Sequence, residues 1–142
     1  MADLMPSTNG HKAEPARKTK ASKPPQVFNR ASEAVAALER QHGPRSDLWT
    51  YHNAEGEPVG LVVRWDGPDG KNVRPVSRNG RGWVVGGMPE PRPLYRLPEL
   101  LKLPEGARVY VCEGEKAADA ARALGLIATT SPHGSKSAAK AD

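Results

Sequence analysis

The sequence has little of what several common classes of protein require. Its single cysteine, Cys112, excludes an internal disulfide framework and a cysteine-rich zinc site. No apolar run approaches the roughly 18 residues of a membrane-spanning helix, and the N-terminus lacks the apolar segment of a signal peptide. Only 5% of the residues are aromatic and 37% are apolar, so we expect a thin core. These absences favour a small cytoplasmic domain, alone or with part of a second one.

The net charge of +5 is unevenly distributed along the chain. Residues 1–25 hold five cations and two acids, and residues 71–96 hold six cations and one acid. A basic tail and a basic patch on a folded segment both favour binding to polyanions. The predicted nucleic-acid-binding residues are Lys71, Arg74, Arg78, Arg81, Arg92 and Arg96. The alternative is that these cations only solubilise a proline-rich surface.

The first 26 residues differ in composition from the rest. Residues 1–26 are rich in Ala, Lys, Pro and Ser and have no aromatic residue, so we predict a disordered basic tail. The second predicted region, residues 27–104, begins with a short structural helix. Ser32 is a suitable N-cap for this helix, and Gly43 followed by proline ends it.

Apolar alternation predicts a small sheet after this helix. Trp49 and Tyr51 lie in its first strand. The same face of the second strand is predicted to carry Val59, Leu61, Val63 and Trp65. A third strand is predicted over residues 72–77, where Pro75 indicates an edge strand or a bulge. Asn79-Gly80 favours a hairpin turn before a fourth strand, so we expect an antiparallel meander of three or four strands.

The last predicted region, residues 105–142, shows a strand–helix–strand pattern. An apolar strand over 107–112 is followed by Glu113-Gly114, a helix over 115–124 and a second strand over 126–130. Such a unit crosses over right-handedly and implies a parallel pair of strands. The pattern places Glu113 at the carboxyl end of a buried strand, where open α/β folds carry their chemistry. Cys112, inside that strand, is interpreted as a small core residue.

Glu113 is the sharpest candidate for a functional residue. Its carboxylate can approach a metal ion or a phosphate, because Gly114 has no Cβ in the way. One carboxylate is a poor magnesium site, since hard divalent ions take several oxygen ligands. The nearest further acids, Glu115 and Asp119, lie four residues apart on one face of the helix. Their simpler interpretation is that acids in a first turn complement the helix dipole.

Two further patterns are weaker. The loop 131–136, with His133 and Gly134, resembles part of a phosphate-binding loop but lacks the P-loop spacing. Cations of the meander, among them Arg64, are interleaved with Trp65 and Trp83, which suits a sheet that holds phosphates and stacks bases. The alternative is that both tryptophans are core residues.

The run from Val109 to Ala120, Val-Tyr-Val-Cys-Glu-Gly-Glu-Lys-Ala-Ala-Asp-Ala, resembles the opening motif of Toprim domains. Such domains occur in bacterial primases and in phage or plasmid primase-helicase proteins. Upstream, the run Pro-Leu-Tyr-Arg-Leu-Pro at 93–98 and the Trp-x-Tyr pattern at 49–51 resemble the segment that precedes Toprim in phage-type primases. The resemblance covers residues 46–140.

The resemblance implies both a fold and a chemistry. The implied fold is α+β, a small antiparallel β-meander followed by the first β-α-β unit of a Toprim-like α/β domain. The implied role of Glu113 is catalytic and metal-proximal, in Mg²⁺-dependent nucleotidyl transfer on DNA. Supporting motif positions are Gly114, Lys116 and Gly134. The implied partners are a single-stranded DNA template, nucleotides and, as a further candidate, a helicase module, in the setting of a mobile element.

The chain also departs from the family pattern. The family holds magnesium with an Asp-x-Asp pair on a later strand, but the only acid after Asp119 is Asp142. We therefore expect a truncated, N-terminal part of a primase-like protein, inactive unless the remainder is supplied. Two alternatives stay open. The chain is a non-catalytic module that binds single-stranded nucleic acid, or it is a fragment of a Toprim nuclease or topoisomerase.

Overall fold

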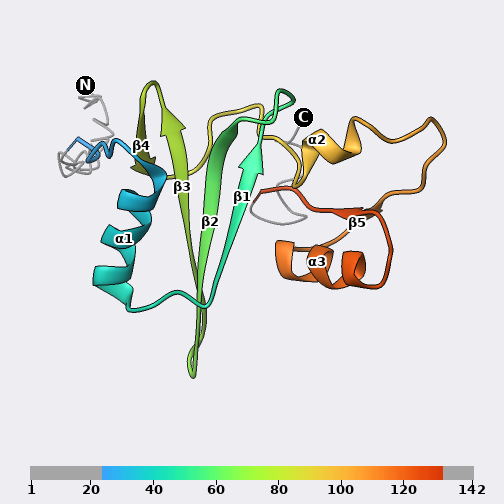
Figure 1. The fold of residues 1–142 in the computed structure, drawn as a ribbon. Helices are drawn as coiled ribbons and strands as arrows, with labels where there is room; N and C mark the ends of the chain where they lie inside the picture. Colours follow the sequence, from blue (N-terminus) through green and yellow to red (C-terminus); the bar gives the residue numbers. More distant parts are fainter. Residues whose placement is uncertain (1–23, 133–142) are drawn as a thin grey trace, which may run out of the picture.

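The computed structural model describes residues 24–132 of the chain (Figure 1). Disorder is predicted over residues 1–26, of which residues 1–23 lie outside the described residues, as do His133 and Gly134 of the predicted loop. The elements are α1 (Ala31–His42), β1 (Asp47–His52), β2 (Pro58–Gly67), β3 (Gly70–Asn79), β4 (Gly82–Val85), α2 (Leu97–Leu100), β5 (Tyr110–Val111), α3 (Glu115–Ala123) and β6 (Ala128–Thr129). None of the helices in the described part of the chain has the length and apolar character needed to cross a membrane.

Strands β1 to β4 form the predicted antiparallel meander, in the order β1-β2-β3-β4. The chain is therefore α+β, as the sequence indicated. Asn79 pairs with Gly82, so the β3–β4 turn is a two-residue loop of Gly80 and Arg81. Gly80 has a φ of 60°, in the left-handed region that glycine adopts without strain. The asparagine–glycine signal therefore marked this turn correctly.

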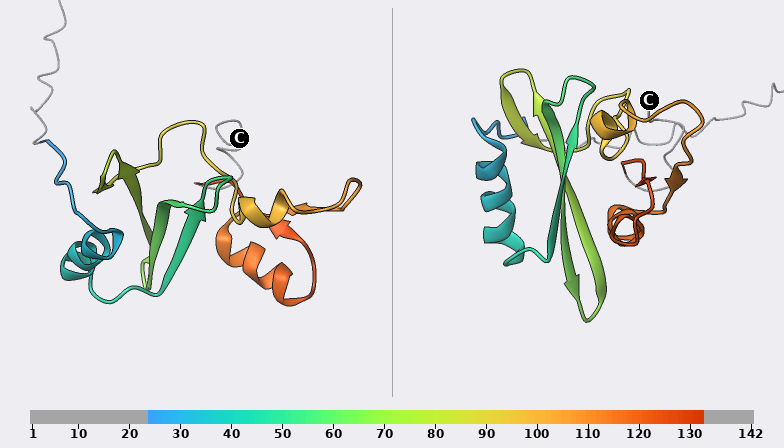
Figure 2. Two further views of the ribbon diagram at one scale, coloured as in Figure 1. Left: turned by 45° about the horizontal axis from the view of Figure 1, so that its top comes forward. Right: turned by 45° about the vertical axis from the view of Figure 1, so that its right-hand side comes forward.

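Helix α1 covers one face of the meander, on the opposite side from α3 (Figure 2). The core on this side consists of Ala34, Val35, Leu38, Leu61, Val63, Trp65 and Val76. The prediction of Ser32 as N-cap is wrong, because the helix begins at Ala31 with Arg30 as its N-cap. The Glu33 carboxylate accepts hydrogen bonds from the backbone N–H groups of Asn29 and Arg30. Glu33 is therefore the side chain that caps this end of the helix. Gly43 ends the helix as predicted, with a φ of 86°.

The other face of the meander packs against α3, β6 and the segment before α2. This second core consists of Trp49, Tyr51, Val62, Met88, Tyr95, Ala118 and Ala128. Val59 packs here and not with Leu61, Val63 and Trp65, so the prediction that these four residues share a face is wrong for Val59. The reason is a register shift, in which Tyr51 pairs with Gly60 and His52 pairs with Pro58. A bulge of this kind reverses the facing of the extra residue.

Pro75 lies in an inner strand, yet part of that strand has a free edge. Strand β4 pairs only with the half of β3 from Val76 to Asn79. The Pro75 carbonyl still accepts a hydrogen bond from the Gly86 N–H at 3.0 Å. The missing N–H of the proline therefore falls where the β4 pairing ends, which is where it is tolerated. The prediction of an edge holds for one half of the strand only.

Strands β5 and β6 form a parallel pair, with Tyr110 opposite Ala128 and Val111 opposite Thr129. Both strands are shorter than predicted. The prediction that β5 is buried is wrong, since Tyr110 is 41% and Val111 67% exposed. The reason is that β5 has β6 on one side and no described strand on the other. Cys112 is correspondingly only half-buried, at the margin of the second core.

Candidate functional site

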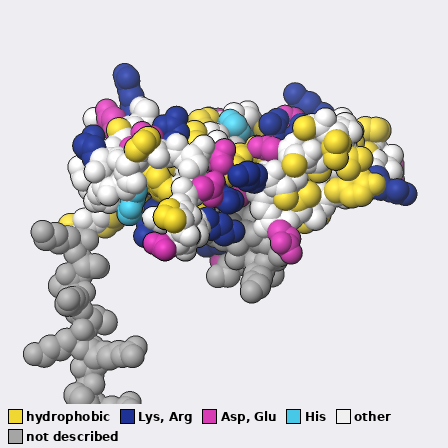
Figure 3. Space-filling view, turned by 90° about the horizontal axis from the view of Figure 1, so that it is seen from below, with side chains coloured by type: hydrophobic (Ala, Val, Ile, Leu, Met, Phe, Trp, Pro, Cys, Tyr) yellow, Lys and Arg dark blue, Asp and Glu magenta, His cyan; other side chains and the backbone are white. Residues whose placement is uncertain are grey.

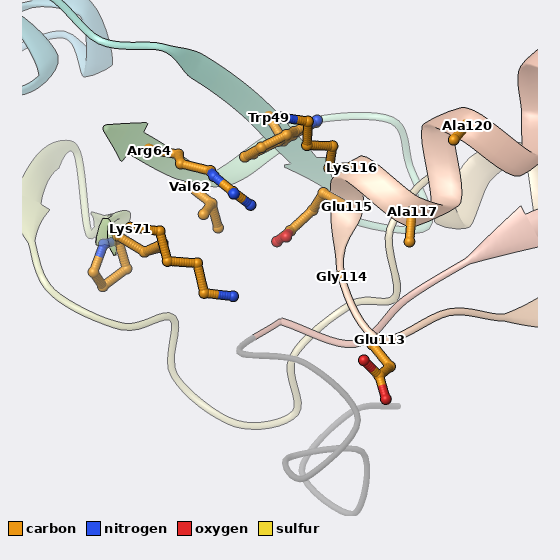
Figure 4. A pocket seen from close by; sticks show the side chains of 12 residues that line it. Trp49, Val62, Arg64, Lys71, Glu113, Gly114, Glu115, Lys116, Ala117 and Ala120 are labelled. Atoms are coloured by element: carbon orange, nitrogen blue, oxygen red, sulfur yellow. The ribbon is translucent and has the colours of Figure 1, made fainter. Parts of the chain in front are cut away.

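A cleft of about 730 Å³ lies between the second face of the meander and the N-terminal end of α3 (Figure 4). The meander contributes Trp49, Val62, Arg64, Lys71, Val73 and Pro75 to its lining, and the other wall consists of Glu113, Gly114, Glu115, Lys116, Ala117 and Ala120. Seen from below, Lys, Arg, Asp and Glu side chains gather side by side at the middle of the molecule (Figure 3). The cleft thus brings acids and bases together from segments far apart in sequence.

The meander wall carries two cations that point into the cleft, Arg64 of β2 and Lys71 of β3 (Figure 4). The strand register places them on one face, because Arg64 pairs with Val73 and Asp66 pairs with Lys71. The Arg64 Nε donates a hydrogen bond to the Asp66 Oδ1 at 2.8 Å. This bond lowers the pKa of the Asp66 carboxyl, with weaker contributions from the charges of Lys116 and Lys71. The cations therefore keep Asp66 ionised beside them.

The opposite wall carries Glu113 and Gly114, in the turn between β5 and α3. The Glu113 side chain is exposed at the edge of the cleft and has no hydrogen bond or ion pair with a described residue. Gly114 is the N-cap of α3, with an extended φ of −162° that any residue adopts. A Cβ at Gly114 would meet no described atom within 4 Å. Neither backbone conformation nor packing explains why this position is glycine.

The two other acids of this helix have structural partners. Glu115 Oε1 accepts a hydrogen bond of 2.7 Å from the Tyr51 hydroxyl. Asp119 accepts one of 2.9 Å from the Trp49 indole N–H and one of 2.8 Å from the Tyr95 hydroxyl. The bonds from Tyr51 and Trp49 join α3 to β1 of the meander, and the bond from Tyr95 joins it to the segment before α2, a role that the sequence analysis missed. The available signal was the pair of acids four residues apart, which matches polar-tipped aromatic residues at alternate positions of β1.

The two tyrosines that donate to these acids, Tyr51 and Tyr95, have raised pKa values. Burial, together with the charge and hydrogen bond of Glu115, raises the pKa of Tyr51 well above its usual value. Burial and the hydrogen bond to Asp119 also raise the pKa of Tyr95. Both tyrosines therefore remain protonated donors at neutral pH, so the connection between helix and sheet is stable there.

The predicted nucleic-acid-binding cations do not form one surface. Lys71 lies in the cleft, whereas Arg74 projects from the face that α1 covers, opposite Val63. Arg78 lies 4.0 Å from the Glu57 carboxylate, with which it forms an ion pair. Arg81 lies in the β3–β4 turn. Two others have contacts within the chain: Arg92 Nε donates to the Met88 carbonyl at 2.9 Å, and Arg96 pairs with Glu99 at 2.9 Å. The cleft instead adds Arg64 and Lys116 to Lys71.

The two tryptophans proposed for base stacking belong to the core beneath α1. Trp65 is 7% exposed, and its indole N–H donates to the Gly43 carbonyl at 2.8 Å. Trp83 is half-buried against the same cluster. The core interpretation of both residues is therefore the one that fits the structure.

Magnesium, which the resemblance implies, needs several carboxylate or carbonyl ligands. No three His, Cys, Asp or Glu residues among the described residues are grouped as a metal-binding set. Glu115 and Asp119, the nearest acids to Glu113, already accept hydrogen bonds from the meander. The described residues therefore do not by themselves fit the ion.

Comparisons of the chain with protein-family models, with curated proteins and with solved structures found no match. Function therefore has to be inferred from the residues of the cleft.

Proposed function

We propose that the chain belongs to a Toprim-type, primase-like protein that acts on DNA, with residues 105–142 as the first β-α-β unit of the Toprim-like domain. Glu113 has no hydrogen bond or ion pair with a described residue, and Gly114 is a glycine that the described fold does not require. The observation that carries the proposal is that these two residues lie across a cleft from Arg64 and Lys71 (Figure 4). A free carboxylate next to an unobstructed backbone is suited to approach by a phosphate ester or its metal ion.

In this proposal the cleft binds phosphate groups of a nucleotide or a template strand. Three cations and two carboxylates line it, and Asp66 pairs with Arg64 at 2.8 Å and with Lys116 at 3.8 Å. Lys71 forms no ion pair with a described residue, so it is the lining cation most available to an anionic ligand. Arg64 and Lys71 contact phosphate oxygens, and Glu113 accepts a proton from a reacting hydroxyl. If a metal site were completed by ligands from elsewhere, Glu113 would supply one oxygen ligand to Mg²⁺. Any further metal-binding carboxylates come from outside the described residues.

Primer synthesis by the longest product of the gene tests the enzymatic proposal. We expect Glu113→Gln to lower Mg²⁺-dependent synthesis on a single-stranded template by about 100-fold or more, as loss of a proton-transferring or metal-proximal group does. Glu105→Gln, which removes an exposed acid ahead of β5, is the matched control and should keep full activity. Equal activity of the two variants would exclude a catalytic role for Glu113. Reading the gene past codon 142 for an apolar strand ending in Asp-x-Asp gives an independent check.

A second candidate, a non-catalytic module for single-stranded nucleic acid, is favoured by the lack of a metal-binding set among the described residues. Two double variants separate the faces that could bind. Arg64→Ala with Lys71→Ala removes the two cleft cations of the meander, and Arg74→Ala with Arg78→Ala removes two cations of β3 that do not line the cleft.

We expect only the cleft variant to weaken binding of a labelled oligothymidylate by the 142-residue chain. Its salt dependence should fall by about 1.4 in the slope of log K against log salt, since each phosphate contact on a single strand contributes about 0.7. A loss confined to the Arg74 and Arg78 variant would place the binding surface outside the cleft. Absence of binding at low salt would exclude the module.

A further inference from the structure

Glu115 is an acid of the cleft that faces Arg64 and Lys71 but forms no ion pair with them. Glu115, the first residue of α3, lines the cleft and points toward Arg64 and Lys71 (Figure 4). Its carboxylate accepts the hydrogen bond from the Tyr51 hydroxyl and forms no ion pair with a described cation, whereas Arg64 pairs with Asp66 at 2.8 Å. The position of this negative charge therefore depends on one buried hydroxyl group.

Tyr51 is well suited to fix that position. Its side chain is fully buried in the second core, and its ring lies 5.6 Å from the ring of Tyr95. A ring that is packed on all sides has one orientation, so its hydroxyl presents a fixed donor to Glu115. The bond is short, at 2.7 Å, as is usual for a hydroxyl that donates to a carboxylate.

The consequence of losing this bond follows from charge. A released Glu115 side chain has two nearby cations, Arg64 and Lys71, with which it can pair across the cleft. Such a pair would compete with a phosphate for the same cations, because the Glu115 carboxylate and the phosphate would accept hydrogen bonds from the same N–H groups of Arg64 and Lys71. The hydroxyl of Tyr51 prevents this competition as long as it holds the carboxylate on the wall of the cleft.

We infer that Tyr51 is a positioning residue for anion binding in the cleft and acts through the charge of Glu115. The inference rests on the proposed function, since it assumes that the cleft binds the phosphates of a nucleic acid. Tyr51 itself contacts no ligand. Its hydroxyl keeps the Glu115 carboxylate apart from Arg64 and Lys71, so that Lys71 forms no ion pair with a described residue and Arg64 pairs with Asp66 alone among them.

The chain provides a matched control for this role. Tyr95 also donates its hydroxyl to a carboxylate of α3, but that carboxylate belongs to Asp119, which does not line the cleft. Asp119 also keeps the Trp49 indole as a second donor. Tyr51→Phe and Tyr95→Phe thus remove the same atom and the same kind of bond, and only the first frees a charge inside the cleft.

The test is a double-mutant cycle on the affinity of the 142-residue chain for a labelled oligothymidylate at low salt. The variants are Tyr51→Phe, Glu115→Gln, the two combined, and Tyr95→Phe, each first checked for a wild-type circular dichroism spectrum. We expect Tyr51→Phe to weaken binding about twofold to fivefold, the range measured for partly exposed charge pairs. Glu115→Gln should strengthen binding, and adding Tyr51→Phe to it should have almost no further effect. Tyr95→Phe should bind as the wild type does.

Other outcomes overturn the inference in distinguishable ways. An equal loss from Tyr51→Phe with and without Glu115→Gln would show that Tyr51 acts through packing and not through the charge. A loss from Tyr95→Phe as large as that from Tyr51→Phe would point to general loosening of α3. If Tyr51→Phe does not fold, the affinity of Glu115→Gln alone tests the inference. Binding by Glu115→Gln that is equal to or weaker than that of the wild type would overturn it. Each of these results leaves the proposed function standing. No binding by wild type or variants would overturn the inference and exclude the single-strand-binding module, and primer synthesis by the Glu113→Gln variant would still decide the enzymatic proposal.

Discussion

Among single residues, Tyr51 couples the stability of the protein to alkaline pH. Its pKa is raised above the ordinary value of 10.0 by burial and by Glu115. Since the folded pKa is the higher one, the contribution of Tyr51 is complete well below pH 10 and is lost progressively as the unfolded chain releases this proton around and above pH 10. The loss for one such group is at most about 1.4 kcal/mol per pH unit. We therefore expect the stability advantage of wild type over Tyr51→Phe to shrink between about pH 9 and 11.

Urea unfolding at a series of pH values measures this effect. Tyr110→Phe is the control, because the Tyr110 side chain is 41% exposed and its hydroxyl has no hydrogen-bond partner among the described residues. A stability difference between wild type and Tyr51→Phe that stays constant across this pH range would contradict the role of the buried hydroxyl. Tyr95, whose pKa is raised in the same direction, adds to the alkaline sensitivity of both proteins equally.

Sequence could identify some residues of the cleft and not others. Glu113 and Gly114 were found because a carboxylate and a glycine at a strand–helix junction form a local pattern. No local sequence pattern marks Arg64 as a functional residue. Its place in the cleft depends on the pairing of β2 with β3 and on the packing of α3 against the meander. Lys71 and Arg74 are separated by an odd number of positions in one strand, so alternation alone places them on opposite faces. The sequence alone therefore predicts that these two cations do not share a face of the sheet.

Among the elements, α3 depends on its polar contacts with the meander more than on apolar burial. Ala118 is its one fully buried residue, and Asp119 accepts hydrogen bonds from Trp49 and Tyr95. Asp119→Ala leaves both donors without an acceptor, which costs about 1–3 kcal/mol for each donor that water cannot reach. We expect a loss of about 2 kcal/mol in the free energy of unfolding, measured by chemical denaturation.

Asp69→Ala is the control for this variant. Asp69 is exposed in the turn between β2 and β3 and makes no hydrogen bond or ion pair with a described residue. Its loss should change the free energy of unfolding by less than about 0.5 kcal/mol. If Asp119→Ala were as mild as Asp69→Ala, the contacts of Trp49 and Tyr95 would not be what holds α3 in place.

The elements that sequence predicted well are those fixed by local signals. The β3–β4 turn and the end of α1 each depend on a glycine with a positive φ, and both were located correctly. The bulge at Val59 and the short, exposed β5 were not predicted. The first depends on the pairing register with β1, and the second on whether a further strand pairs with the free edge of β5. Apolar alternation does not reveal a change of register, and an apolar strand can be exposed when no further strand pairs with its edge.

In the whole molecule, the meander is a shared layer between two cores, and the second core joins residues of both predicted regions. Trp49, Tyr51 and Tyr95 of residues 27–104 pack with Ala118 and Ala128 of residues 105–142. Apolar surface remains at the end of the molecule where β5 and α3 lie, on the right in Figure 3. The most exposed large apolar residues at this end are Leu101, Val111 and Leu124, at 61%, 67% and 81%.

This surface leads to a prediction about self-association. A strand edge with unpaired backbone groups and apolar side chains is a template for pairing with other chains. We expect the 142-residue chain to form soluble aggregates with rising concentration, and Val111→Lys to reduce them, because a charge on an edge strand opposes pairing. Val27→Lys is the control, since Val27 is 58% exposed but lies outside every strand. Light scattering after size-exclusion chromatography measures the molar mass of wild type, Val111→Lys and Val27→Lys at each concentration. A wild type that stays monomeric at all concentrations would show that the β5 edge is protected in solution.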